Sequence, residues 1–171
     1  MALYLISNNS QATATAPPGV TTGTSLKTLL QLKTNQAAVY TKGMSTIRIK
    51  EWGISFDGSA AATPIKCELI ETDGAATVTA LSVYDIVKFD NYYSPDPALT
   101  YSTITSGFSS SNEGTITGSR LFDLQFVAPT NQYVKQFPLG LEPVLTIERF
   151  LRIRVTAGTA VNAYCYVLIE V

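Results

Sequence analysis

Apolar residues recur at every second position over much of the chain, and the stretches between them are rich in Gly, Pro, Asn and Asp. This period of two predicts β-strands joined by loops, with few helices. The alternation is clearest in residues 46–56, where the apolar parity changes at Glu51-Trp52-Gly53. The change predicts a β-bulge at that point, with Gly53 supplying backbone freedom.

Three further segments predict strands with one buried and one solvated face. Their apolar positions are Ile65, Cys67 and Leu69 in a strand opened by Pro64, then Phe122, Leu124 and Phe126, and finally Leu151, Ile153 and Val155. The polar residues between them, such as Glu68 and Asp123, are expected to face solvent. Residues 161–171 are apolar at nearly every position, which predicts a central strand covered on both sides.

Four segments lack a clear period. Residues 25–33 fit a helix or a strand, and the strand is favoured because Leu30 and Leu32 alternate and threonines flank them. Residues 7–24 have almost no apolar periodicity, which predicts a flexible N-terminal arm or loop. Residues 91–118 and 129–143 are predicted to be long irregular excursions.

The whole chain, residues 1–171, is predicted to fold as one domain, because its length suits a single hydrophobic core. About eight strand candidates at irregular spacing favour an all-β fold. The predicted architecture is a two-sheet antiparallel sandwich of jelly-roll type. An immunoglobulin-like sandwich is the alternative.

The surface is expected to carry little charge. Twelve Lys and Arg residues against thirteen Asp and Glu residues leave a formal net charge of −1, so no strong field favours nucleic acid or an anionic membrane. Weak repulsion between copies is compatible with self-association. The N-terminus does not resemble a signal peptide, and no run approaches the roughly 18 apolar residues of a membrane span. We therefore expect a soluble protein made in the cytosol.

The residue types argue against most catalytic chemistry. The chain contains no histidine, which excludes His-dependent hydrolase triads and His-ligated metal sites. Neither glycine-rich phosphate-binding pattern occurs. A carboxylate pair of the glycosidase type stays possible in principle, but Glu68 and Glu71 have opposite strand parity, and Asp57 and Asp73 lie in Asp-Gly turns. We expect no enzyme activity, no cofactor and no metal, although residues 90–96 could be a calcium loop instead of a solvated turn.

Two small sets of residues predict structural roles. Cys67 and Cys165 lie in apolar stretches and are expected to be buried free thiols. Arg149, Arg152 and Arg154 form the only basic cluster, and Arg152 and Arg154 should share one strand face. That face is expected to be solvated or to form ion pairs between subunits.

Aromatic residues in the two long excursions are the best candidates for a protein interface, because such side chains are enriched where proteins bind. They are Tyr92, Tyr93, Tyr101, Phe108, Tyr133 and Phe137. The alternative is that each folds back onto the domain as a satellite cluster.

Several stretches resemble a group of small structural proteins of tailed bacteriophages. These stretches are Lys27-Thr28-Leu29-Leu30-Gln31-Leu32, residues 49–59 (IKEWGISFDGS), Glu68-Leu69, Gly114-Thr115-Ile116-Thr117, residues 133–140 (YVKQFPLG), residues 151–156 (LRIRVT) and Val161-Asn162-Ala163-Tyr164. The group has a sheet framework and no catalytic motif.

The resemblance implies a virion component assembled in a bacterial host cytoplasm. Its most direct form is a jelly-roll capsid decoration or cement protein, which binds the major capsid protein where subunits meet and is often a trimer. A tail-associated or minor capsid role is nearly as compatible. A carbohydrate-binding β-sandwich module is a rival, weakened because the sole tryptophan, Trp52, is expected in a buried strand.

Overall fold

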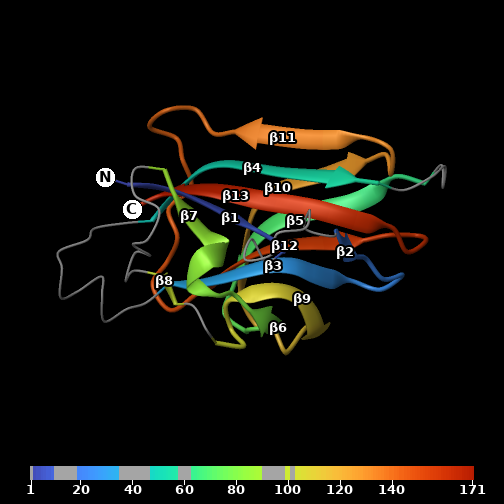
Figure 1. Cartoon of the computed structure of the whole chain (residues 1–171), viewed down its shortest axis with the longest axis horizontal. Helices are drawn as coiled ribbons and strands as arrows, with labels where there is room; N and C mark the ends of the chain where they lie inside the picture. Colours follow the sequence, from blue (N-terminus) through green and yellow to red (C-terminus); the bar gives the residue numbers. More distant parts are fainter. Residues whose placement is uncertain (1, 10–18, 35–46, 58–62, 90–98, 101–102) are drawn as a thin grey trace.

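The computed structural model of the chain describes residues 2–9, 19–34, 47–57, 63–89, 99–100 and 103–171. In this part of the chain two antiparallel β-sheets pack face to face as a sandwich, as Figure 1 shows. The jelly-roll-like all-β sandwich predicted from the alternation is confirmed.

The first sheet contains β1 (Leu3–Ser7), β2 (Val20–Thr21), β4 (Arg48–Phe56), β7 (Ile86–Lys88), β11 (Gln132–Gln136) and β13 (Asn162–Glu170). Its order is β11-β4-β13-β1-β7, and β2 pairs with the start of β13. Because β1 and β13 are antiparallel neighbours, Ala2 and Val171 exchange backbone hydrogen bonds of 2.9 and 3.0 Å. The two chain ends therefore lie side by side, at the left of Figure 1.

The second sheet contains β3 (Lys27–Thr34), β5 (Ile65–Thr72), β6 (Thr77–Ala80), β8 (Leu99–Thr100), β9 (Gly107–Asn112), β10 (Ser119–Val127) and β12 (Phe150–Thr156). Its order is β10-β5-β12-β3-β9-β6, and β8 pairs with β3. A short 3-10 helix, η1 (Val83–Asp85), lies between β6 and β7. The strand predicted over residues 25–33 is confirmed as β3, so the helical alternative is wrong.

One hydrophobic core fills the space between the sheets. Its largest fully buried apolar side chains are Trp52, Tyr4, Ile6, Leu29, Leu30, Ile49, Ile54, Ile65, Leu69 and Leu81. At about 25 cal/mol per Å² of buried apolar area, this core is the main force that stabilises the fold. Trp52 has no exposed surface, as its place in the alternation predicts.

The bulge predicted in β4 exists, one residue earlier than expected. Leu168 of β13 faces Glu51 and Ile169 faces Ile49, so Lys50 is the extra residue. The apolar residues on both sides of the bulge therefore point into the core. Gly53 lies outside the bulge, and its lack of a side chain has another purpose, described below.

The burial predicted for β10 is inverted. Asp123 is buried, whereas Phe126 is 66% exposed and Leu124 is half-buried. The register of β10 against β5 shifts between Leu121 and Asp123, so Phe122 is an extra residue that reverses the parity. Asp123 tolerates its inward position because hydrogen-bond donors from other strands surround it.

The outer face of β5 and β12 is covered, which corrects the expectation that its polar residues face solvent. Glu68, Arg152 and Arg154 are all buried, and Arg152 and Arg154 share one face as predicted. The Arg154 Nη2 atom lies 2.8 Å from Glu68 Oε2. These are ion pairs within one chain, rather than solvated groups or pairs between subunits.

Both excursions contain strands that the sequence pattern did not predict. β9 lies within residues 91–118, and β11 lies within residues 129–143. β9 reads Gly-Phe-Ser-Ser-Ser-Asn, which has little intrinsic strand preference, yet it pairs with both β3 and β6. The pairing is non-local, so local pattern could not indicate it.

The prediction of an arm over residues 7–24 is wrong for residues 7–9 and 20–22. Asn8 is fully buried, donates from Nδ2 to the Ala163 carbonyl at 2.9 Å and accepts from the Cys165 N–H at 3.0 Å. On the far side, β2 pairs with β13, and Thr22 is buried. Residues 7–9 and 20–22 are thus part of the sandwich, while residues 10–18 lie outside the described part of the chain.

β13 is a central strand, as predicted, but it is fully covered on one side only. Ala163, Cys165, Val167 and Ile169 are buried, while the alternate residues are half-buried or exposed. Cys67 and Cys165 are buried free thiols, which confirms that prediction. Burial raises the pKa of Cys67 to about 12 and that of Cys165 well above its usual value.

Candidate functional site

The aromatic interface candidates fall into two groups. Tyr92, Tyr93 and Tyr101 lie outside the described residues. Phe108 on β9, Tyr133 on β11 and Phe137 after β11 are half-buried and pack against the core. The structure does not bring these three into one surface, and their role in an interface stays a prediction.

Tyr133 belongs to a polar cluster that joins the edges of the two sheets. The buried Asp123 carboxylate on β10 accepts hydrogen bonds from Trp52 Nε1 on β4 at 3.0 Å and from the Tyr133 hydroxyl at 2.9 Å. It also accepts from Lys135 Nζ on β11 at 2.9 Å and from Gln125 Nε2 at 3.1 Å. Because the four donors come from both sheets, we name this set of five residues the Asp123 clip.

Electrostatics within the Asp123 clip favour the charged carboxylate. Burial alone would raise the pKa of Asp123, but hydrogen bonds from Lys135, Gln125 and Tyr133 outweigh it and hold the pKa below its usual value. Burial, with the neighbouring carboxylate, raises the pKa of Tyr133 to about 12. The Tyr133 ring also meets Trp52 edge-on, with ring centres 5.5 Å apart. The clip is saturated with internal partners, as expected of a structural site.

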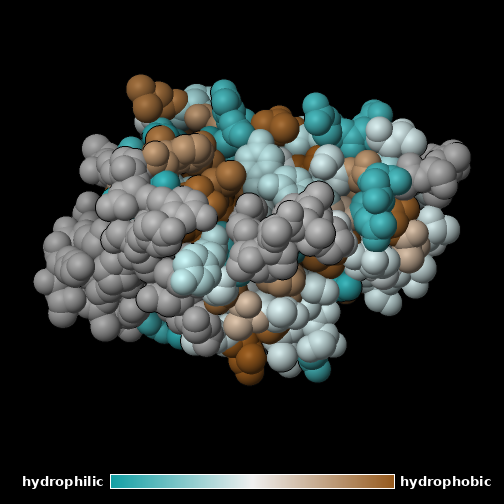
Figure 2. All heavy atoms as spheres, viewed as in Figure 1, coloured by the Kyte–Doolittle hydropathy of each residue, from teal (hydrophilic) through white to brown (hydrophobic). Residues whose placement is uncertain are grey.

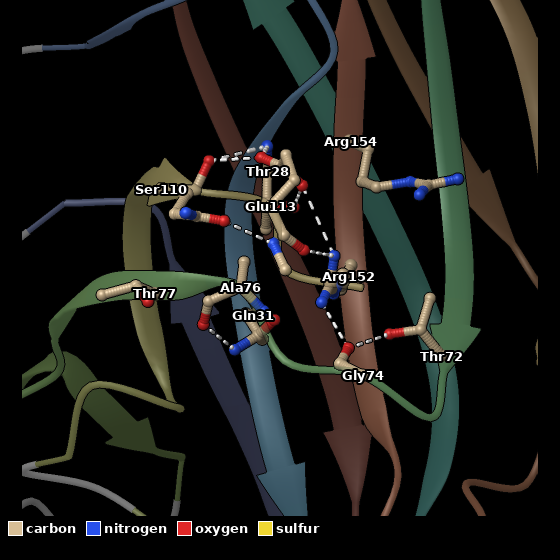
Figure 3. A network of polar contacts seen from close by, with 12 residues as sticks. Thr28, Gln31, Thr72, Gly74, Ala76, Thr77, Ser110, Glu113, Arg152 and Arg154 are labelled. Carbon is tan, nitrogen blue, oxygen red and sulfur yellow. Dashed lines mark hydrogen bonds and ion pairs between the residues drawn. The ribbon is translucent and has the colours of Figure 1, made fainter. Parts of the chain in front are cut away.

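A second polar cluster fastens two loops over the outer face of the second sheet (Figure 3). The guanidinium of Arg152, with no exposed surface, donates to the Glu113 carbonyl at 3.1 Å and to the Gly74 carbonyl. Glu113 in turn accepts from the Thr28 N–H and hydroxyl, both at 2.6 Å. Burial lowers the pKa of Arg152 to about 10, which leaves it charged at neutral pH.

Gln31 extends this cluster toward β6. Its side-chain amide donates to the Ala76 carbonyl at 3.0 Å and accepts from the Ala76 N–H at 2.8 Å, as Figure 3 shows. A third bond runs from Gln31 Nε2 to the Thr105 carbonyl at 2.9 Å. The buried polar groups thus hold loops in place, and the carboxylate of Glu113, which borders a hollow of about 250 Å³ beside Lys27, is already occupied by partners within the chain.

Among the described residues, the two most exposed large apolar side chains lie in a loop tip that sequence reasoning did not single out. After β11 the chain makes a turn in which the Leu141 N–H donates to the Pro138 carbonyl at 2.9 Å. Leu139 is 91% exposed, Leu141 is 74% exposed, and Gly140 between them has a φ of +84° that other residues rarely adopt. We name residues 138–141 the leucine tip.

Hydrogen bonds and ion pairs fix the base of the leucine tip. The buried Glu142 carboxylate accepts from the Gly140 N–H at 2.8 Å and from Lys50 Nζ at 2.7 Å. The backbone is joined to β4 on both sides, through Phe137 N to Lys50 O and Ile49 N to Pro143 O, each 2.9 Å. The two leucines are therefore displayed on an ordered support.

The leucine tip differs from the surface around it in being apolar. On the face drawn in Figure 2, hydrophobic side chains lie in small groups among polar ones, and one group stands out at the upper left, where Figure 1 places the loop after β11. Exposed apolar residues that stand singly are normal on proteins. Here two leucines, separated by one residue, are exposed on a loop whose base is hydrogen-bonded, which makes them a candidate contact surface.

The Arg149 end of the basic cluster borders a polar hollow of about 310 Å³. Arg120 in its wall pairs with Glu71 at 3.0 Å, and Arg149 lies 3.8 Å from Asp73. Each arginine already has an acidic neighbour, so the hollow carries no surplus positive charge for an anion.

Within the described ranges, no three His, Cys, Asp or Glu residues lie close enough to hold a metal ion. The loop considered for calcium, residues 90–96, lies outside those ranges. No described helix is long and apolar enough to cross a membrane. Comparison of the chain with protein-family models, curated proteins and solved structures finds no match.

Proposed function

We propose that the chain is a non-enzymatic structural protein of a tailed-bacteriophage virion, which binds the capsid and stabilises it. The resemblance of its sequence segments to such proteins motivates the proposal. The observation that carries the binding function is the leucine tip, where two leucines are held in solvent by an ordered loop.

The energetics of the leucine tip suit a binding anchor. Full burial of one leucine side chain is worth about 1.5–3 kcal/mol, so burying both would contribute roughly 3–6 kcal/mol. Little conformational entropy would be lost, because the Glu142 contacts already fix the loop. A stable interface buries about 1,600 Å², so the tip would be an anchor at its centre, with neighbouring loops supplying the rest.

The partner suited to this tip is a capsid subunit with an apolar pocket. Charged residues beneath the tip balance one another. Lys50 Nζ lies 2.7 Å from Glu142 and 3.2 Å from Glu170, and Arg48 lies 4.0 Å from Glu142. A partner therefore needs no strong opposite charge. Binding of many copies at subunit junctions would favour the intact shell by mass action. We expect a homotrimer, which would engage three subunits at once.

The experiment is co-sedimentation with empty capsids of the encoding phage, followed by heating of the capsids with and without bound protein. We expect wild-type protein to sediment with capsids and to raise their disruption temperature. Leu139→Ser with Leu141→Ser should weaken binding about a hundredfold or more, from the lost burial. Leu26→Ser is the matched control, because Leu26 is a 37% exposed leucine beside Lys27, which contacts Thr21 at the Asn162 end of β13, whereas the tip is supported at the Glu170 end.

Three outcomes would contradict the proposal or a part of it. Wild-type protein that neither sediments with capsids nor protects them from heat would exclude the cement function. Sedimentation with purified tails alone would favour the tail-associated alternative. If the control weakened binding as much as the double variant, the leucine tip would not be the anchor.

A further inference from the structure

The outer face of β4 and β13 carries two neighbouring tyrosines, Tyr164 and Tyr166, that the proposed capsid contact does not use. The absence of a side chain at Gly53 explains the orientation of the Tyr166 ring. A Cβ atom at Gly53 would be 2.5 Å from Tyr166 Cε1 and 2.8 Å from its Cζ, so the ring covers the place where a side chain would stand. The ring therefore lies along the sheet with its other side turned outward.

The position of this ring is fixed at its far end. The Tyr166 hydroxyl donates to Glu51 at 2.5 Å, one residue beyond the bulge in β4. The Tyr164 ring is centred 6.4 Å away at an interplanar angle of 39°. Together the two rings form a preorganised aromatic surface, which we name the tyrosine platform.

Two hollows lie along the tyrosine platform and share Tyr164 and Ser55 as walls. The first has a volume of about 200 Å³ and adds Tyr166, Gln132 and Val134. The second, of about 160 Å³, adds Asp57 and Asn162. The combined volume of the two hollows reaches the lower end of the range of ~300–1,000 Å³ that is usual for ligand sites.

The polar side of the second hollow is also held in place. Asn162 Nδ2 donates to Asp57 at 3.2 Å, and Asn162 Oδ1 accepts from the Thr21 hydroxyl at 2.8 Å. Among the described residues that line either hollow there is no lysine or arginine. The groove thus combines aromatic faces with amide, hydroxyl and carboxylate groups and has no positive charge.

We propose that this groove binds a neutral oligosaccharide of hexopyranose units. A pyranose ring has an apolar C–H face that packs on an aromatic ring, and hydroxyls at its edge that need donors and acceptors such as amides and carboxylates. The acidic Asp57 and Glu51 disfavour an anionic sugar. Two neighbouring sugar units would bind, one in each hollow, with Tyr164 between them. The hollows lie along the Ser55 end of β4, whereas the leucine tip is joined to the Ile49 and Lys50 end of that strand, so the groove does not use the capsid contact.

The test is saturation-transfer NMR and calorimetric titration of the whole chain with cellohexaose, maltohexaose and chitohexaose. We expect at least one hexasaccharide to bind, with saturation transferred to its ring C–H protons. Tyr164→Ala and Tyr166→Ala should each weaken that binding roughly tenfold, the loss expected for one aromatic contact. Tyr84→Ala, which removes a 56% exposed tyrosine on η1, should change it less than twofold.

Tyr164→Phe keeps the ring and should bind within a few-fold of wild type, which separates lost stacking from lost folding. The inference is overturned if none of the three hexasaccharides binds at millimolar concentration, or if Tyr164→Ala and Tyr84→Ala bind equally well. Sugar binding should persist in the Leu139→Ser, Leu141→Ser variant, and capsid sedimentation should persist in Tyr164→Ala. The two proposals can therefore fail separately.

Discussion

Replacing Asp123 with alanine is expected to destabilise the sandwich by about 3–5 kcal/mol, the usual cost of removing one member of a buried ion pair. The Asp123 side chain is 4% exposed, and its carboxylate accepts four hydrogen bonds. Without it, the buried Trp52 N–H and Tyr133 hydroxyl lose their partner, at roughly 1–3 kcal/mol for each unsatisfied group. The lost ion pair with Lys135 adds less to the destabilisation, because the Lys135 side chain is one-third exposed.

Urea unfolding followed by tryptophan fluorescence measures this loss directly, because Trp52 is the only tryptophan and is itself a donor to Asp123. For a chain of this size the melting temperature should fall by roughly 6–20 °C. Asp57→Asn is the control, since Asp57 is exposed, and it should stay within about 0.5 kcal/mol of wild type. If Asp123→Ala lowered the free energy of unfolding by less than about 1 kcal/mol, the stabilising role of the Asp123 clip would be refuted.

The same carboxylate predicts a pH dependence. The pKa of Asp123 in the folded protein lies below the value in an unfolded chain, which is about 3.9. The stability that the ionised carboxylate contributes is therefore complete above about pH 3.9, and it is lost as the pH falls through the pKa of the folded protein. The free energy of unfolding should fall less steeply below about pH 4 in Asp123→Asn than in wild type, as acid titrations of both proteins would show.

Three further predictions follow from other sites. Arg152→Ala should cost about 3–5 kcal/mol in urea unfolding, against less than about 1 kcal/mol for the half-exposed Arg120→Ala, and equal losses would contradict the cluster in Figure 3. Cys67 and Cys165 should react with a thiol reagent only at the rate of unfolding, and rapid labelling of native protein would disprove their burial. Asn8→Ala should destabilise the fold by about 1–3 kcal/mol, whereas a neutral effect would restore the free-arm interpretation.

The sequence was sufficient to predict features that depend on local alternation. The core faces of β4, β5, β12 and β13, the buried thiols and the shared face of Arg152 and Arg154 all follow from the period of two. The bulge in β4 was also predictable, because the apolar residues themselves change parity there.

Features that depend on distant partners were not predictable. The inward position of Asp123 needs the bulge at Phe122 and donors from β4 and β11, and none of these is visible in the local pattern of β10. β9 is held by Glu113 contacts and by pairing to strands far away in sequence. Nor does the pattern show which apolar loop residues fold back, as Phe137 does, and which stay in solvent, as Leu139 does.

The most direct test of the proposed function is a cryo-electron microscopy map of capsids of the encoding phage saturated with the wild-type protein. The account predicts density for the sandwich at the junctions between capsid subunits, with the leucine tip against the shell and both leucines buried in an apolar pocket. A map in which the protein is bound with residues 138–141 pointing into solvent, or in which the capsid surface is bare, would contradict it.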